Sequence, residues 1–282
     1  MLSIIIINYK TPKLTADCIR SVFAQRADIP FEIIIVDNAS GDDSQNFITT
    51  SFPSVKWIQM TYNAGFARAN NEGIRNSSGD SVLLLNSDTI IVDNAVNDCY
   101  KTFSASSYVA CGVQLLNPNG SPQISGNYFM KGSLNNLLPL PVIGPFIKSI
   151  GNILKVKKPH VPDADRPVEV DWINGAYLMV KKSVISQAGL LDEDFFLYAE
   201  EAEWCYRLKK AGKLIIYGQF KVMHLQGESS SVAFTSNSQG YSDLYDKKGL
   251  QIMLSNFVRV RKQYGAGWFI FHLIIYTLNI PV

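Results

Sequence analysis

Short apolar runs alternate with stretches of helical pattern over the first hundred residues, and this alternation restricts the fold more than any other feature. Four runs of mainly β-branched and aliphatic residues occur, at 3–7, 31–36, 55–60 and 81–85. Such runs are typical of strands buried on both faces of a parallel sheet. Helices are expected between them, from Thr11-Pro12, which supply an N-cap and a first-turn proline, to about Gln25, and over 67–76. The alternation predicts an α/β fold with a mostly parallel sheet covered by helices on both faces.

The pattern changes after about residue 105. Further strands are expected at 108–117, 168–171, 176–180 and 214–222. A strong turn follows at 117–120, and a helix is expected over about 200–210, with Gly212 as its C-cap. Between Lys131 and Pro167 we expect only a short amphipathic helix near 146–154. From about Tyr241 the sequence predicts one or two helices.

These patterns divide the chain into a catalytic domain at 1–230 and a C-terminal helical extension at 231–282. Within the domain, we expect a nucleotide-binding half at about 1–105 and an acceptor half at about 106–230. The apolar content of 47% is ample for a core of this size.

Charge and cysteine content exclude several classes of protein. The formal net charge of +2 argues against a dedicated nucleic-acid-binding protein. The four cysteines form no C-x-x-C pair, so neither a zinc knuckle nor a redox motif is indicated, and we expect reduced core thiols. The N-terminus has no basic segment typical of a secretory signal, so a cytoplasmic location is expected.

Two apolar segments, 137–156 and 268–282, fall short of the roughly 18 uninterrupted apolar residues that a membrane span needs. Each could lie on a membrane surface, which would make the protein peripheral on the inner face of the cell membrane. Packing onto the catalytic domain or a partner subunit, including a homo-oligomer, is the alternative.

Polar residues stand where strands end. No G-x-G-x-x-G or G-x-x-x-x-G-K-[ST] sequence is present, so the dehydrogenase and ATPase interpretations lose their main support. Instead Asp37-Asn38 closes the second strand, at the edge where open α/β sheets bind ligands, and could accept hydrogen bonds from a nucleoside. Asn86 and Asp88 end the fourth strand and offer oxygen ligands for a divalent cation held beside a diphosphate. A locally capped turn is the alternative at both places.

The helix at 200–210 presents an unusual carboxylate. Trp204, Cys205 and Leu208 lie at i+3, i+4 and i+7 from Glu201, which therefore heads the apolar stripe. Glu200, Glu203 and Arg207 are expected on the other side, with Glu203 and Arg207 as an i, i+4 pair. Since buried carboxylates usually have a partner or a function, Glu201 is a candidate catalytic group. Charge complementarity with the helix N-terminus is the alternative, and it explains Glu200 better than Glu201. His224, at a strand exit, could reach a metal or a phosphate, and a structural hydrogen bond is the alternative.

Together these residues resemble the family 2 glycosyltransferases, particularly their bacterial rhamnosyltransferase-like branch. The resemblance extends from about Ser3 to Ser230 and rests on ordered motifs at 3–9, 36–40, 63–73, 85–89 and 172–176 with 192–201. It implies a GT-A fold that binds a nucleotide diphosphate sugar. The residues implied at the donor are Asn8, Asp37, Asn38, Asn63, Gly65, Asn71 and Asn86.

The resemblance also implies the catalytic roles. Asp88 and His224 would hold Mg²⁺ or Mn²⁺, with Asn86 in the first position of the family's metal-binding triplet. Glu201 occupies the general-base position, which is usually aspartate, so the reach of its carboxylate differs. The residues implied at the acceptor are Trp172, Gly175 and Glu200.

The implied function is that of a metal-dependent inverting hexosyltransferase in cell-envelope polysaccharide biosynthesis. The branch favours dTDP-L-rhamnose as donor, and a glycan or lipid-linked saccharide as acceptor. A sugar-phosphate nucleotidyltransferase should carry a Gly-rich, basic loop after the first strand, which 8–12 does not. A non-catalytic nucleotide-sugar-binding or carbohydrate-binding protein would have no need of Glu201.

Overall fold

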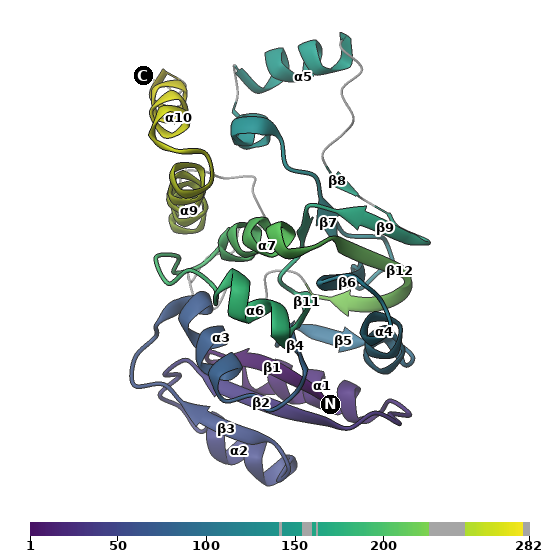
Figure 1. The fold of residues 1–282 in the computed structure, drawn as a ribbon. Helices are drawn as coiled ribbons and strands as arrows, with labels where there is room; N and C mark the ends of the chain where they lie inside the picture. The colour runs from purple at the N-terminus through teal and green to yellow at the C-terminus, as the bar shows by residue number, and fades with distance from the viewer. Residues whose placement is uncertain (141–142, 154–159, 162, 226–245, 279–282) are drawn as a thin grey trace.

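A computed structural model describes residues 1–140, 143–153, 160–161, 163–225 and 246–278. In these residues a central sheet has the strand order β3-β2-β1-β4-β11-β6-β12-β5, with β9 paired to β12 (Figure 1). Its strands are β1 (Leu2–Asn8), β2 (Phe31–Asp37), β3 (Lys56–Gln59), β4 (Ser81–Asn86), β5 (Thr89–Ile91), β6 (Ala110–Leu116), β9 (Pro167–Val170), β11 (Tyr177–Lys181) and β12 (Leu214–His224). Every strand expected from the sequence is therefore present, with shifts of one or two residues at its ends.

Four neighbouring strands of the central sheet are parallel, so their carboxyl ends lie at the same edge. β3, β2, β1 and β4 are parallel neighbours, and their register places Asn8 beside Asp37 and Ile7 beside Asn86. β12 is parallel to β6, whereas β11, β5 and β9 run antiparallel to their neighbours. The polar residues that end β1, β2 and β4 consequently meet at one edge of the sheet.

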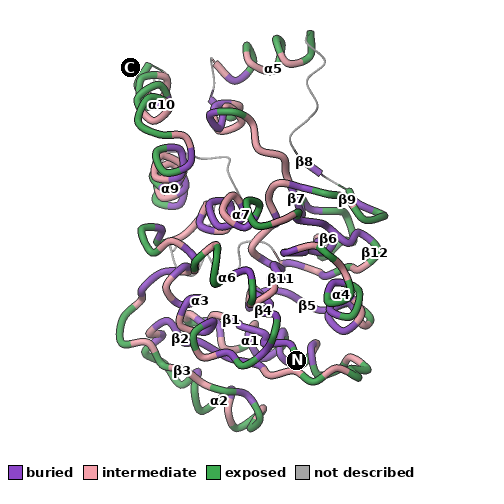
Figure 2. Tube along the Cα trace, in the orientation of Figure 1, coloured by how far each residue is buried: buried purple, intermediate pink, exposed green. Residues whose placement is uncertain are grey.

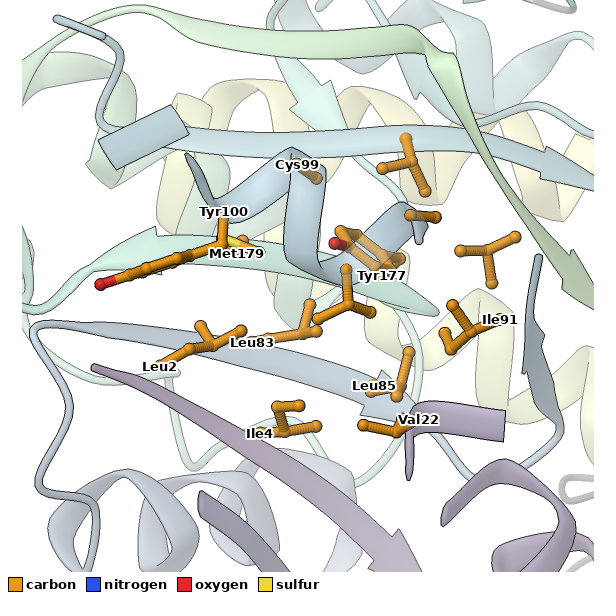
Figure 3. Close-up of a cluster of buried hydrophobic side chains, with 14 of the residues drawn as sticks. Leu2, Ile4, Val22, Leu83, Leu85, Ile91, Cys99, Tyr100, Tyr177 and Met179 are labelled. Carbon is orange, nitrogen blue, oxygen red and sulfur yellow. The ribbon is translucent and has the colours of Figure 1, made fainter. Parts of the chain in front are cut away.

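Helices cover both faces, as the apolar runs predicted. The helices α1 (Pro12–Phe23) and α4 (Ala95–Ser104) pack on one face, and α3 (Gly65–Arg75), α6 (Lys182–Ala188) and α7 (Glu200–Ala211) pack on the other. Along β1, Ile4 and Ile6 belong to the first core and Ile5 to the second, because successive strand residues point to opposite faces. Figure 3 shows part of the first core, where Ile4, Val22 and Cys99 gather. All four cysteines are buried free thiols, as expected.

Helix α1 follows Thr11 and begins at Pro12 as expected, but it ends at Phe23 rather than near Gln25. Helix α2 (Ser44–Ser51) had no sequence prediction, because only Ser44 and Ile48 of its eight residues are buried and no apolar stripe forms. Gly212 follows α7 as expected, but its backbone is extended rather than left-handed. A Cβ at Gly212 would overlap the Val109 side chain, so close packing explains that glycine better than helix capping.

The region between 131 and 167 contains more structure than its sequence predicted. The expected short helix is present as α5 (Ile143–Ile153), and a 3₁₀ segment, η1 (Lys131–Leu137), precedes it. Gly132 and Ser133 inside η1 have positive φ, which is why no regular helical pattern marks this segment. Three short strands, β7 (Gly126–Asn127), β8 (His160–Val161) and β10 (Trp172–Ile173), form a separate small sheet.

Two C-terminal helices, α9 (Lys247–Tyr264) and α10 (Ala266–Leu278), confirm the helical prediction for the end of the chain. Ser255 of α9 donates to the Leu197 carbonyl at 2.7 Å, just before α7. His272 of α10 lies 2.7 Å from the Gly132 carbonyl oxygen of η1. The expected boundary at 230/231 lies outside the described residues.

Exposed apolar side chains gather on α5 and α10, which lie at the end of the molecule away from β2 and β3 (Figures 1 and 2). These residues are Phe146, Ile150, Ile153, Ile270, Phe271, Leu273, Ile274 and Leu278. No helix in the described part of the chain is long and apolar enough to cross a membrane.

Candidate functional site

The ends of β1 and β2 hold a buried carboxylate in a closed network. Asp37 Oδ1 accepts from the Asn8 amide at 2.6 Å and from the Ser40 hydroxyl at 2.5 Å. Its Oδ2 accepts from the Ser40 N–H at 2.9 Å and from the Gln59 amide at 2.7 Å. Thr15 in turn donates to Asn8 Oδ1 at 2.8 Å, which fixes the Asn8 side chain. The structure thus brings together Asn8 and Asp37, two residues predicted to bind the nucleotide-sugar donor. It adds Ser40 and Gln59, which were not predicted as site residues.

Asn38 connects this network to the start of α3. Its amide donates to Asn63 Oδ1 at 2.8 Å, and its Oδ1 accepts from the Ala64 N–H at 2.9 Å. Asn63 Oδ1 also accepts from the Gly65 N–H at 3.1 Å, so the three predicted residues form one hydrogen-bonded corner. Gly65 has φ +84°, and the next N–H, that of Phe66, donates to the Phe196 carbonyl at 2.7 Å. This contact ties the start of α3 to the loop that leads into α7.

Asn71, predicted to bind the nucleotide-sugar donor, makes its observed hydrogen bonds to other parts of the protein. Its side chain is fully buried and exchanges two hydrogen bonds with the Leu191 backbone, at 2.9 and 3.0 Å. It also donates to Glu193 at 3.1 Å. Its observed contacts therefore position the loop at 191–196, and a direct donor contact remains a prediction.

Asp88 and His224 come together although 136 positions separate them in sequence. Pairing of β5 with β12 places Thr89 opposite His224, and the Leu225 N–H donates to the Asp88 carbonyl at 2.9 Å. As a result, His224 Nε2 lies 3.4 Å from Asp88 Oδ1, with both side chains buried. A carboxylate oxygen and an imidazole nitrogen that face each other could both bind a divalent transition metal, whereas Mg²⁺ would use mainly the carboxylate.

No cluster of three or more metal-binding side chains occurs among the described residues. A cation at Asp88 and His224 would therefore take its other ligands from substrate oxygens and water, as Mg²⁺ commonly does. Asn86 extends the same edge: its N–H donates to the Ala176 carbonyl at 3.1 Å. The neighbouring Gln123, which the sequence analysis missed because it lies 101 positions from His224, contacts the imidazole Nδ1 at 3.0 Å.

Glu201 lies half-buried at the start of α7, beside two of the predicted acceptor residues. The indole N–H of Trp172 donates to Glu201 Oε1 at 3.1 Å. A Cβ added to Gly175 would stand 3.4 Å from Glu201 Cγ, so the backbone of Gly175 lies against this side chain. Burial raises the pKa of Glu201, while the Trp172 hydrogen bond opposes that rise.

The faces of α7 differ from the prediction. Glu200 and Glu203, expected on the outer side, are buried, whereas Glu201 is only half-buried. The prediction assumed a helix with a single buried stripe, but α7 packs against α6, β10, β12 and α9. Glu203 is buried because it pairs with Arg207, as the sequence predicted, through bonds of 2.6 to 2.9 Å.

Glu200, a predicted acceptor residue, is 3% exposed, and its Oε2 has no hydrogen-bond partner among the described residues. Burial, and then the negative charge of Glu201, raise the pKa of Glu200 well above its usual range. The two residues before it, Tyr198 and Ala199, both have positive φ. A left-handed conformation at two successive residues other than glycine costs free energy.

The parts of the site are linked through the loop that precedes β11. The Asn86 N–H donates to the Ala176 carbonyl, and the preceding residue, Gly175, lies against Glu201. Residues 175–176 therefore connect the end of β4 to the Glu201 side chain. A hollow of about 470 Å³, lined by residues such as Tyr128 and Lys210, contains none of the predicted site residues. We attach no function to that hollow.

Two curated relatives align over most of the chain. The low-salt glycan biosynthesis hexosyltransferase Agl10 of Haloferax volcanii is 30% identical over 254 residues, which are 87% of this chain and 74% of the relative. The N-acetylglucosaminyl-diphospho-decaprenol L-rhamnosyltransferase of Mycobacterium tuberculosis is 26% identical, over 71% of this chain and 68% of its own length.

Solved structures show the same fold at low identity. GalNAc-T7 with UDP, GalNAc and Mn²⁺ aligns with a TM-score of 0.58 and 14% identity, over 94% of this chain and 56% of that one. S. aureus TarS 1-349 in complex with UDP aligns with a TM-score of 0.54 and 13% identity, over 93% and 73% of the two chains. These likenesses, with the mixed sheet and its flanking helices, confirm the expected GT-A architecture.

The family follows from the sequence match. Residues 3–156, more than half of the chain, match the sequence model of Glycosyl transferase family 2. The 30% identity to a hexosyltransferase over most of both chains points to the same family. The chain belongs to glycosyl transferase family 2 and is therefore a transferase.

Proposed function

We propose that this chain is a metal-dependent, inverting glycosyltransferase that uses a nucleotide diphosphate sugar. The observation that carries the proposal is the pair Asp88 and His224, whose Oδ1 and Nε2 atoms lie 3.4 Å apart. The strand end that precedes Asp88 is connected to Glu201 through residues 175–176. The nucleotidyltransferase and non-catalytic binding interpretations are less well supported, because the chain belongs to a glycosyl transferase family.

The donor is proposed to lie along the ends of β1, β2 and β4. Asn8, Asn38 and Asn63 would support the nucleoside, with Asp37 holding the corner rigid through its four protein hydrogen bonds. We propose dTDP-L-rhamnose as the donor. Two relatives support this choice by their names, an L-rhamnosyltransferase of M. tuberculosis and the dTDP-rhamnosyl transferase RfbF of Shigella flexneri.

In the proposed reaction, Glu201 accepts the proton of the acceptor hydroxyl as that oxygen attacks the anomeric carbon from the face opposite the leaving group. A general base of this kind contributes about 10²–10⁴-fold in rate. Trp172 holds the carboxylate in place through its indole N–H. A divalent cation held by Asp88 and His224 would neutralise the departing nucleoside diphosphate. Attack from the opposite face inverts the anomeric centre.

The acceptor is proposed to be a lipid-linked or polymeric saccharide of the cell envelope. One relative's name specifies a diphospho-decaprenol substrate. The exposed apolar residues of α5 and α10 support peripheral contact with a membrane, because α10 carries no charged residue and both helices lie at the same end of the molecule (Figure 2). In this arrangement we propose that residues 1–230 form the catalytic domain and 231–282 an extension whose helix α10 touches the membrane.

The donor and the metal are tested together. Purified protein is incubated with a panel of nucleotide sugars and Mn²⁺ or Mg²⁺, and nucleoside diphosphate release is measured with and without EDTA. Metal-dependent release from one donor, lost in Asp88→Asn but kept in the exposed control Asp93→Asn, supports the proposal. EDTA-resistant release would refute the metal dependence.

The base is tested with an active donor and acceptor pair. Glu201→Gln is expected to lose about 10²–10⁴-fold in kcat. Donor affinity, measured by calorimetry, should stay near that of the wild type, because Glu201 contacts the acceptor side. An unchanged kcat would remove Glu201 from the mechanism.

Membrane contact is tested by flotation with vesicles containing anionic lipid. A double variant, Ile274→Ser with Leu278→Ser, is expected to lose binding. Phe47→Ser on α2 removes an exposed apolar residue at the other end of the molecule and should bind normally. Equal binding of both variants would contradict a membrane contact through α10.

A further inference from the structure

The imidazole of His224 is held on the side away from Asp88 by one buried glutamine. Gln123 follows the 117–120 turn, and its backbone N–H donates to the Leu115 carbonyl at 2.8 Å. Its side-chain amide donates to the His224 carbonyl oxygen at 2.7 Å and to Asn117 Oδ1 at 2.8 Å. Its Oε1 lies 3.0 Å from His224 Nδ1.

These contacts determine which nitrogen of the ring carries hydrogen. A backbone carbonyl can only accept, so the amide nitrogen of Gln123 must face the His224 carbonyl, and the amide oxygen must face Nδ1. An amide oxygen is also only an acceptor, so Nδ1 must be the donor in this bond. In a neutral ring the other nitrogen, Nε2, then presents its lone pair.

That lone pair faces a carboxylate. Nε2 lies 3.4 Å from Asp88 Oδ1, and two acceptors at this distance in a buried place attract a cation between or beside them. We propose that Gln123 is a positioning residue, which fixes His224 in the Nδ1–H tautomer so that Nε2 and Asp88 are prepared to bind a divalent cation. The tautomer rests on the hydrogen bonds alone, and its purpose rests on the proposed metal-dependent function. Partners that hold the second nitrogen of a metal-binding histidine typically change metal affinity by 10- to 100-fold.

The tautomer can be measured directly, because the chain has only three histidines. Protein labelled with ¹⁵N-histidine is studied without metal at about pH 8.5, where an ordinary imidazole is neutral. Long-range ¹H–¹⁵N correlations are expected to show His224 as the Nδ1–H tautomer. His272 is an internal control with the opposite assignment, because its Nε2 donates to the Gly132 carbonyl at 2.7 Å. An Nε2–H tautomer or an imidazolium at His224 in the wild type would overturn the proposal, whatever the variants do.

Variants then test the part played by Gln123. Gln123→Leu removes the acceptor from Nδ1, so the Asp88 carboxylate should draw the proton to Nε2, while His272 stays unchanged. Gln114→Leu is a matched control: it also removes a buried glutamine, one that bonds to the Gln123 carbonyl and not to His224. An unchanged His224 spectrum in folded Gln123→Leu would also overturn the proposal.

Metal affinity separates this inference from the proposed function. Mn²⁺ binding in the presence of dTDP is followed by electron paramagnetic resonance, and Gln123→Leu is expected to weaken it about 10- to 100-fold. Gln114→Leu should keep the wild-type affinity. If neither Asp88→Asn nor Gln123→Leu changed Mn²⁺ binding while the tautomers were as expected, the proposed metal site would be refuted and the tautomer assignment would stand.

Discussion

A single methyl group at Gly65 should disturb both halves of the site. Gly65 has φ +84°, and a Cβ built on it would lie 2.8 Å from Phe196 Cα and closer still to the Phe196 carbonyl oxygen. That oxygen accepts the Phe66 N–H, so it cannot move away without breaking the bond between the start of α3 and the loop before α7. We expect Gly65→Ala to shift this loop, and with it the start of the helix that carries Glu201.

The magnitude follows from two contributions. Holding alanine at positive φ costs about 1–2 kcal/mol, and the stiffer unfolded chain returns about 0.4–1 kcal/mol of that. Overpacking against a backbone that must shift costs about 1–3 kcal/mol more. Gly120 separates these contributions, because it has a similar φ of +80° and its added Cβ would meet nothing within 4 Å. We therefore expect a loss of about 0.5–1 kcal/mol for Gly120→Ala and of about 1.5–4 kcal/mol for Gly65→Ala.

Urea unfolding of the two variants and the wild type measures these losses. Sugar transfer by Gly65→Ala, assayed at a temperature where it stays folded, should fall by about 10²-fold or more, because a displacement of roughly 1 Å at a catalytic group has an effect of that size. Gly120→Ala should keep wild-type turnover. Equal losses of stability in the two variants, or full activity in Gly65→Ala, would refute the close contact with Phe196.

Three further predictions concern the carboxylates of α7. Burial raises the pKa of Glu201, the proposed general base, which must be ionised to accept a proton. In a pH–rate profile, kcat/KM should therefore fall as pH drops, with a midpoint above the pKa of an exposed carboxyl. Trp172→Phe removes the N–H that favours ionised Glu201 and should move this acid limb to still higher pH, whereas Trp57→Phe should not; a shift to lower pH would contradict the assignment. Burial raises the pKa of Glu200, so the folded state holds its proton more tightly than the unfolded state, and this contribution to stability is lost as pH rises through the ordinary carboxyl range and beyond. Glu200→Gln should therefore gain stability relative to the wild type between about pH 5 and pH 8 in urea unfolding, and a loss at pH 8 would contradict the buried, partly protonated state.

The sheet could be predicted from sequence because its signal is local. The strands β1, β2 and β4 each contain four consecutive apolar residues, a pattern typical of strands buried on both faces of a sheet. Their polar ends then follow from parallel pairing, since the register that aligns Ile4 with Ile33 also brings Asn8 beside Asp37. The closed network around Asp37 could not be predicted in the same way, because Ser40 and Gln59 are ordinary loop and edge residues until the fold turns them toward the carboxylate.

Helix α7 shows where periodicity fails. A 3.6-residue pattern locates one apolar stripe, and that stripe correctly contained Trp204, Cys205 and Leu208, all buried in the core. The same pattern placed Glu200 and Glu203 outside, which is wrong, because burial on a second side depends on how α6 and α9 pack around the helix. A helix surrounded on several sides can bury a charged residue that has a partner, as Arg207 provides for Glu203. Glu200 is buried differently, with its pKa raised well above the usual range by burial and by the charge of Glu201.

The proposed cation site depends on pairing between distant strands. Asp88 and His224 could each be predicted as candidates because each follows the end of a strand. Their proximity could not be predicted, because β5 has only three residues and its sequence does not indicate that it pairs with the end of β12. That pairing brings the two side chains together, and the turn at 117–120 carries Gln123 back against the same strand end. The chemistry of the pair is consequently set by three segments that meet only in the folded protein. For this reason a substitution at Gln123, which no sequence motif marks, should affect metal binding more than many substitutions nearer to Asp88 in the chain.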